Sequence, residues 1–345
     1  MMLQLLQIAL AAGVDNIAVV GGFHADTIAA IKPKLETTWK LVAAVNATEG
    51  EVAAATAFVT APLPMLAQAR AALLYQYDFT GYVESDLAKI PPTITVANTH
   101  QSSVPIAEYV IAGILEWVTG LRQMDAEMRS CTWKSGPPGN TCKRSLHRQV
   151  SNATIGILGY GHIGEAIATR AAAFGARLIA TTLPPLPPEP PKPLSWLGDD
   201  SMNARLFRES DFVVVCTPLT NTTRGLVNAS LLAALGADGV IINIARGPVV
   251  DEEALFRALS TKAVGGAILD VWWNSIFELP PGGVGPSSWP SAHRFDQLPN
   301  VIMSPHESGN TPQSRDEAIT EVAQNLDNIA LGRPLENVVR KGKRP

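Results

Sequence analysis

The sequence predicts an α/β protein with parallel sheets. Short apolar runs alternate with helical patterns along most of the chain. A glycine-rich turn joins one such run to a helix at residues 154–174. The 345 residues are enough for two domains of roughly 100–200 residues each.

Composition supports a folded core and excludes two classes of partner. Hydrophobic residues make up 46% of the chain and charged residues 17%, so we expect a sizeable core rather than disorder. The formal net charge of −4 argues against nucleic acid or an anionic membrane surface as the main partner.

The spacing of the cysteines indicates the redox state of the compartment. Cys131, Cys142 and Cys216 lack metal-type spacing, so we expect no metal site and a reducing compartment. A Cys131–Cys142 disulfide is the less favoured alternative.

Residues 3–14 are apolar but too short to span a membrane, and no Lys or Arg precedes Lys32. We therefore expect a helix packed on the first domain, no membrane segment, and a cytoplasmic location.

The first third of the chain predicts a small α/β domain. Strands are expected at residues 16–22, 39–45, 57–60, 72–77 and 93–97, and helices at 25–35, 51–57 and 62–71. A long helix is expected at 103–128, and residues 135–141 (SGPPGNT) break it.

The rest of the chain predicts a nucleotide-binding domain that starts with the glycine turn. Further strands are expected at residues 177–182, 211–217, 239–245, 263–271 and 301–304, and helices at 231–235, 251–260 and 312–331. Seven prolines between Pro184 and Pro193 exclude a helix or a central strand there. We expect this stretch to be a surface connection, with a proline-rich ligand for another protein as the alternative.

The turn GYGHIG has the G-x-G-x-x-G spacing of dinucleotide-binding sites, between a strand and a helix. Gly159 allows the tight turn, Gly161 lets the backbone approach a pyrophosphate, and Gly164 lets helix and strand pack closely. The N–H groups of His162 and Ile163 would then face the phosphates.

Charged side chains follow several of the predicted strands. Arg246, Asp270 and His306 each stand where a strand ends, and the turn at residues 78–81 follows another strand. Open α/β sheets bind ligands at this edge. An arginine there can hold a carboxylate with two parallel hydrogen bonds, and a histidine can move a proton near neutral pH. The alternatives without a function are a surface salt bridge for Arg246 and a capped loop residue for His306.

At these residues the chain resembles the D-isomer-specific 2-hydroxyacid dehydrogenase family. The matching stretches are residues 107–115, 159–164, 210–228, 243–255, 265–271 and 298–309. The resemblance implies two Rossmann-like, doubly wound parallel-sheet domains with a cleft between them. It implies a discontinuous substrate domain at residues 1–118 plus 307–345 and an NAD(P)-binding domain at 119–306. It also implies a homodimer.

The resemblance also assigns roles to individual residues. Arg246 would bind the substrate carboxylate and polarise the keto oxygen, which His306 would protonate. The backbone of Phe79, Thr80 and Gly81 would grip the carboxylate from the other domain. The remaining assignments concern the cofactor: Asp270 and the backbone near Ile244 would hold the nicotinamide amide, and Thr217 and Pro218 would line the adenine side.

The chain departs from the family pattern at two places. Ser275 stands where the family usually has a glutamate that raises the pKa of the catalytic histidine, and a serine supplies no negative charge. Glu278 and Glu307 are the candidates to compensate. NAD-specific members carry an acidic residue at the end of the second strand, where this chain has Thr181 and Thr182. We therefore expect NADP to be slightly favoured over NAD, with Lys192 near enough in sequence to reach back.

The sequence thus predicts an NAD(P)-dependent enzyme acting on a small 2-keto or 2-hydroxy acid. Formate dehydrogenases also lack the glutamate, and their histidine motif ends in Ser-Gly as HESG does here, so a formate-dehydrogenase-like activity is one alternative. The other is a catalytically weak NAD(P)-sensing binding protein. Retention of both Arg246 and His306 counts against it.

Overall fold

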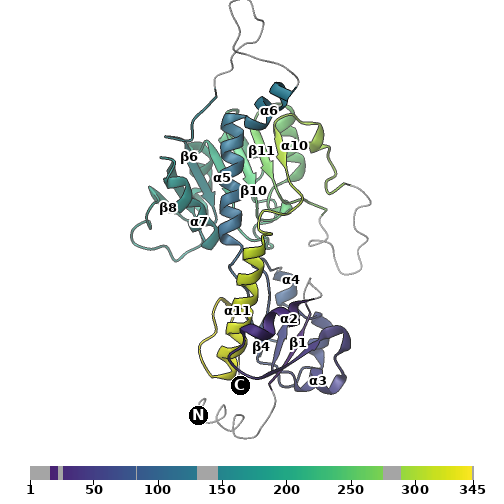
Figure 1. Ribbon diagram of the computed structural model, residues 1–345. Helices are drawn as coiled ribbons and strands as arrows, with labels where there is room; N and C mark the ends of the chain where they lie inside the picture. Colours follow the sequence, from purple (N-terminus) through teal and green to yellow (C-terminus); the bar gives the residue numbers. More distant parts are fainter. Residues whose placement is uncertain (1–15, 22–25, 83, 130–146, 275–288, 344–345) are drawn as a thin grey trace, which may run out of the picture. The chain divides into compact units, whose positions relative to one another are not determined.

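The computed structural model describes residues 16–21, 26–82, 84–129, 147–274 and 289–343 (Figure 1). The chain divides into two compact units, each with its own sheet. The first comprises Met1–Ser102 and Asn310–Pro345, and the second comprises Ser103–Gly309. The class predicted from the sequence, two parallel-sheet α/β domains, is confirmed.

The first unit contains a six-stranded sheet. In spatial order its strands are β13 (Val338–Arg340), β5 (Thr95–Ala97), β4 (Leu74–Gln76), β3 (Ala57–Val59), β1 (Asn16–Val20) and β2 (Trp39–Ala43). Its helices are α2 (Thr27–Ile31), α3 (Glu49–Ala54), α4 (Glu84–Leu87) and α11 (Pro312–Ala330), and short 3-10 turns lie at Lys32–Lys34, Ala44–Asn46 and Leu63–Ala67. All neighbouring strands are parallel except β13, which pairs antiparallel with β5.

Helix α11 joins the first unit although it comes from the far end of the chain. Thr311 and Ser314 form a capping box at its start, and Pro312 occupies the first turn. Its apolar face packs on β1 and its neighbours, with Leu326 fully buried. The carboxylate of Asp327 is 3% exposed and accepts hydrogen bonds from the backbone N–H groups of Glu36 (2.8 Å) and Thr37 (2.9 Å). Packing and polar contacts therefore both fix the returning helix.

The second unit contains a seven-stranded sheet in which every pair is parallel. In spatial order its strands are β12 (Val301–Met303), β11 (Gly266–Leu269), β10 (Val240–Asn243), β9 (Phe212–Val215), β6 (Thr154–Leu158), β7 (Arg177–Thr181) and β8 (Trp196–Gly198). Its helices are α5 (Ser103–Thr119), α6 (Leu121–Arg129), α7 (His162–Ala172), α8 (Asn203–Glu209), α9 (Ala229–Leu235) and α10 (Glu252–Ser260). The direction of winding reverses between β6 and β9, which is where doubly wound sheets bind ligands.

The predicted domain boundary at residue 118 differs from the division between the units by one helix, α5. Its buried side chains, among them Val110 and Ile114, lie in the same apolar cluster as Ile155 of β6 and Ile167 of α7. Helix α5 therefore belongs to the second unit by its packing.

Two of the expected helices are shorter or broken. Gly120, at φ +63°, ends α5, and α6 continues at an angle of 57° rather than as one helix over residues 103–128. Residues 62–71 form only the 3-10 turn Leu63–Ala67. Among the described residues no single helix is long and apolar enough to cross a membrane, and α5 with α6 passes that test only as a bent pair.

The proline-rich stretch connects β7 to β8, and residues 183–192 are exposed along it. It is therefore a surface connection, as expected. The predicted N-terminal helix at residues 3–14, the break at 135–141, and Cys131 and Cys142 lie outside the described residues.

Candidate active site

The glycine turn lies between β6 and α7, next to the end of β9. Gly159 has φ +99°, and a Cβ there would lie 2.8 Å from the backbone nitrogen of Thr217. A Cβ at Gly164 would lie 2.9 Å from the carbonyl oxygen of Gly159, so the helix can approach the strand only without a side chain there. A Cβ at Gly161 would meet nothing within 4 Å. The space above Gly161 is thus open for a ligand. Contacts within the protein do not explain why position 161 is a glycine.

Helix α7 starts at this turn, with Gly161 as the N-cap residue and His162 and Ile163 as its first two residues. Because the cap is a glycine, it brings no side chain of its own to the N–H groups of the first turn. A helix start of this kind suits a phosphate group.

The two threonines at the end of β7 differ in their surroundings. Thr181 is 2% exposed, and its hydroxyl donates to Oδ1 of Asn203 on α8 (2.7 Å). Thr182 is half-buried, and its hydroxyl lies 3.5 Å from the carbonyl oxygen of Tyr160. Of the pair, Thr182 is the one with a partly accessible side chain. After β9, which lies on the other side of β6, Thr217 is half-buried and Pro218 is exposed.

Arg246 follows β10 and is held by local hydrogen bonds. The buried side chain of Asn243, the last residue of β10, donates to the carbonyl oxygen of Arg246 (3.0 Å) and accepts from the N–H of Ala245 (3.1 Å). Nη1 of Arg246 donates to the carbonyl oxygen of Ala245 (2.7 Å). Ile244, within this turn, is buried. Asn243 was not predicted as part of the site, since a buried asparagine at a strand end carries no specific signal.

Asp270 follows β11 directly and is fully buried. One carboxylate oxygen accepts hydrogen bonds from the Ser304 hydroxyl (2.5 Å) and the Glu307 N–H (2.9 Å), and the other accepts from the Ser308 N–H (3.0 Å). All three donors belong to residues 304–308, the loop that follows β12. Asp270 thus organises the loop that carries His306, a role beyond the cofactor contact expected from the sequence.

His306 is half-buried in this loop and has a left-handed backbone, with φ +62°. Burial is the main cause that lowers the pKa of its imidazole, and the nearby Arg246 guanidinium adds to the effect. The carboxylates of Asp270 and Glu307 act in the opposite direction without reversing it. Arg246, Asp270 and His306 follow β10, β11 and β12, which are neighbours in the sheet, so all three residues lie at the same edge of it.

The turn at residues 78–81, which was expected to bind a carboxylate, lies in the first unit after β4. Phe79, Thr80 and Gly81 are half-buried there. Asn98 donates from its side chain to the carbonyl oxygen of Thr80 (2.6 Å), and the Asp78 carboxylate accepts from the hydroxyl of Thr60 (2.6 Å). These contacts fix the turn within its own unit.

The residues that follow Asp270 in the chain are described only in part. Ser275, and with it Glu278, lies outside the described residues. Trp272 is 7% exposed and donates from Nε1 to the carbonyl oxygen of Ser304 (2.9 Å), while Trp273 stacks on Phe295. Both tryptophans therefore pack in or against the apolar core of the second unit.

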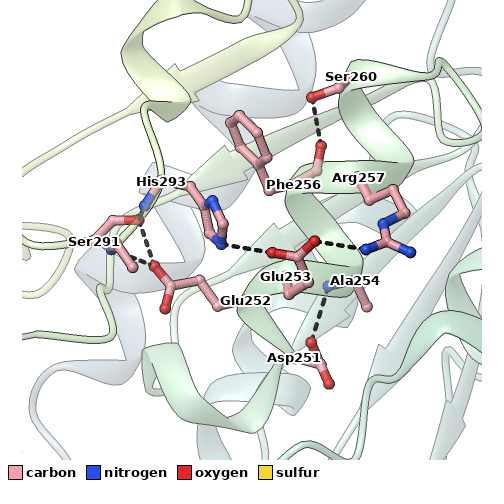
Figure 2. Close-up of polar contacts among 10 residues, drawn as sticks. Asp251, Glu252, Glu253, Ala254, Phe256, Arg257, Ser260, Ser291 and His293 are labelled. Carbon is pink, nitrogen blue, oxygen red and sulfur yellow. Dashed lines mark hydrogen bonds and ion pairs between the residues drawn. The ribbon is translucent and has the colours of Figure 1, made fainter.

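A second polar cluster lies on α10, shown in Figure 2, and ties residues 291–293 to that helix. The Glu252 carboxylate accepts from the Ser291 hydroxyl (2.6 Å) and the N–H of Ala292 (2.7 Å). Glu253 pairs with Nε2 of His293 (3.0 Å) and with Arg257 (2.8 Å), and the His293 ring stacks on Phe256. These contacts anchor the chain, so His293 has a structural explanation.

The fold and the strand-end residues define an α/β protein with the glycine turn of dinucleotide-binding sites and with an arginine, an aspartate and a histidine after other strands of the same sheet. Residues 111–308 match the family described as D-isomer specific 2-hydroxyacid dehydrogenase, NAD binding domain. The chain belongs to this family.

Individual relatives are consistent with this assignment. The chain is 34% identical over 232 residues to glyoxylate/hydroxypyruvate reductase A of Arabidopsis thaliana, a match that covers 67% of this chain and 66% of that one. It is 36% identical over 222 residues to glyoxylate reductase of Thermococcus onnurineus, covering 63% and 60%. The matched stretch is thus less than two thirds of the length of either relative.

Solved structures share the fold over nearly the whole chain. The 2-hydroxyacid dehydrogenase of Ketogulonicigenium vulgare superposes with a TM-score of 0.74 at 24% identity, covering 96% of this chain and 100% of that one. A D-isomer specific 2-hydroxyacid dehydrogenase of Xanthobacter autotrophicus, solved with NADPH, gives 0.75 at 24% identity, covering 95% and 99%.

Proposed function

We propose that the protein is an NAD(P)-dependent 2-hydroxyacid dehydrogenase that works as a reductase of small 2-keto acids. The observation that carries the proposal is the placement of Arg246, Asp270 and His306 after three adjacent strands, β10, β11 and β12, of the sheet that also carries the glycine turn. An anion-binding cation and a proton donor at one edge of the sheet suit a 2-keto acid, which has a carboxylate and a carbonyl oxygen.

Each residue has a defined task in this proposal. The open space above Gly161 and the start of α7 fit a pyrophosphate, and the cofactor, when bound there, supplies the hydride. Arg246 binds the substrate carboxylate and polarises the keto oxygen, and His306 delivers a proton to that oxygen. Asp270 orients the His306 loop.

NADP is the slightly favoured cofactor in the proposal. The end of β7 has threonines instead of an acidic residue, which removes one repulsion against a 2′-phosphate. Thr182 is the side chain available to the ribose, because Thr181 is occupied by Asn203.

A homodimer is part of the proposal and rests on α6. Leu121, Met124 and Met128 are 65%, 42% and 49% exposed, and their spacing puts them along one side of the helix. A second copy of the chain would bury this apolar stripe.

The decisive experiment measures initial rates of NADPH and NADH oxidation with glyoxylate, hydroxypyruvate and other 2-keto acids. We expect turnover with at least one of them, loss of turnover in His306→Ala, and retention in the matched control His293→Ala, because the His293 contacts lie on α10. Absence of turnover in a protein that still binds NAD(P)H would refute the reductase. Formate oxidation, suggested by the HESG motif, and then nucleotide sensing would be tested next.

A further inference from the structure

We propose that Tyr109 is a positioning residue for the proposed reaction, holding the His306 loop in place through Ser304 and Asp270. The inference rests on the proposed function for its catalytic consequence only. Tyr109 lies on α5, and its hydroxyl is 2.6 Å from the hydroxyl of Ser304, which is 195 positions further along the chain. Both residues belong to the second unit.

The direction of the hydrogen bonds follows from the acceptors. A carboxylate only accepts, so the single proton of the Ser304 hydroxyl is used in its 2.5 Å bond to Asp270. The Ser304 oxygen must then accept from Tyr109. Burial is the main cause that raises the pKa of Tyr109, which keeps this phenol protonated and able to donate. The chain of donation thus runs from Tyr109 to Ser304 to Asp270.

The loop needs this support because of the backbone at His306. A φ of +62° is unfavourable for a residue with a side chain and persists only where neighbouring contacts fix it. Those contacts flank His306 on both sides: Ser304 before it, and the N–H groups of Glu307 and Ser308 after it, all bonded to Asp270. Trp272 adds a hydrogen bond to the carbonyl oxygen of Ser304. Tyr109 is the member of this set contributed by a helix outside the strand ends.

The test replaces Tyr109 with phenylalanine, which removes only the hydroxyl. We expect faster amide hydrogen exchange at Glu307 and Ser308. We also expect the kcat for keto acid reduction to fall roughly three- to tenfold, which corresponds to the net free energy of one hydrogen bond. The KM for the keto acid should change less than about twofold, because Arg246 and the glycine turn are untouched. Ser304→Ala should reproduce both effects, and Ser304→Thr, which keeps the hydroxyl, should restore both.

The matched control is Tyr75→Phe. Tyr75 is a buried tyrosine of the first unit whose hydroxyl donates to the carbonyl oxygen of Ala61 (2.7 Å). Tyr75→Phe therefore also removes one buried tyrosine hydrogen bond, but one that does not involve the His306 loop. If Tyr109→Phe leaves exchange at residues 307–308 as in Tyr75→Phe, the positioning role is refuted. The exchange measurement needs no turnover, so a wild-type protein without reductase activity would refute the proposed function and leave this test intact.

Discussion

At the scale of single residues, the surroundings of His306 disfavour its protonated, charged form. Burial and the Arg246 guanidinium lower the pKa of His306 below the ordinary value of 6.5. In the proposed reaction, reduction of a keto acid needs the protonated imidazole of His306, so the reactive form is present at low pH and is lost as pH rises through this lowered pKa.

The kcat/KM for reduction, measured with saturating cofactor, should therefore decline with rising pH about a midpoint below 6.5. The reverse oxidation needs neutral His306 and should stay active to correspondingly lower pH. A pH–rate profile in both directions checks this, and a reduction midpoint above the ordinary histidine value would show that another group restores the charge.

The glycine turn offers a contrast between two substitutions. Gly159→Ala puts a side chain at φ +99° and 2.8 Å from the Thr217 nitrogen, so we expect a loss of about 1–3 kcal/mol in the free energy of unfolding together with weaker cofactor binding. Gly161→Ala meets no protein atom within 4 Å, so its unfolding free energy should stay within about 0.5 kcal/mol of wild type.

The two variants are compared by thermal unfolding without cofactor and by NADPH titration. Gly161→Ala should raise the Kd about tenfold while leaving stability unchanged, since its methyl group would occupy pyrophosphate space. Unchanged affinity in Gly161→Ala would move the phosphate site away from this turn.

At the scale of elements, α11 depends on one buried carboxylate. Asp327 accepts hydrogen bonds from the N–H groups of Glu36 and Thr37 and from the Thr37 hydroxyl. Asp327→Ala leaves these donors without their acceptor, and we expect the first unit to lose about 3 kcal/mol of stability. Hydrogen exchange of β1 and β2 amides in urea measures this. The exposed Glu317→Ala on the same helix serves as control, and equal protection in both variants would contradict the argument.

The sequence predicted the elements whose pattern is strong. Fully buried strands such as β6, β9 and β10 appear as apolar runs, so they were found in the right places. The three-residue edge strands β8 and β13 were missed, because a half-buried strand of that length carries almost no periodicity. The break at Gly120 was missed because the apolar pattern of α5 outweighed one glycine.

The candidate site follows the same division. Arg246, Asp270 and His306 were found because a charged residue directly after an apolar run is visible in the sequence. Tyr109 and Ser304, which are linked by hydrogen bonds to Asp270, were not found, because a hydrogen bond across 195 positions leaves no local pattern. The sequence thus predicts the charged candidate residues more readily than the residues that contact them.

At the scale of the whole molecule, the exposed stripe on α6 predicts self-association. Met124→Glu should shift a dimer toward monomer, because a carboxylate would have to be buried between two helices. Light scattering coupled to gel filtration measures the mass. Arg122→Glu, a substitution at a residue that is polar in the wild type, is the control for added negative charge. A wild-type protein that runs as a monomer at all concentrations would contradict the assembly.

The buried pair of Thr181 and Asn203 has a consequence for protein engineering. An exchange of cofactor preference toward NAD would normally begin with an aspartate at the end of β7. At position 181 such a carboxylate would be placed inside the protein against the side chain of Asn203, where it costs stability and faces α8 rather than a ribose. A redesign should therefore start at Thr182, and a library confined to position 181 would return poorly folded variants rather than switched ones.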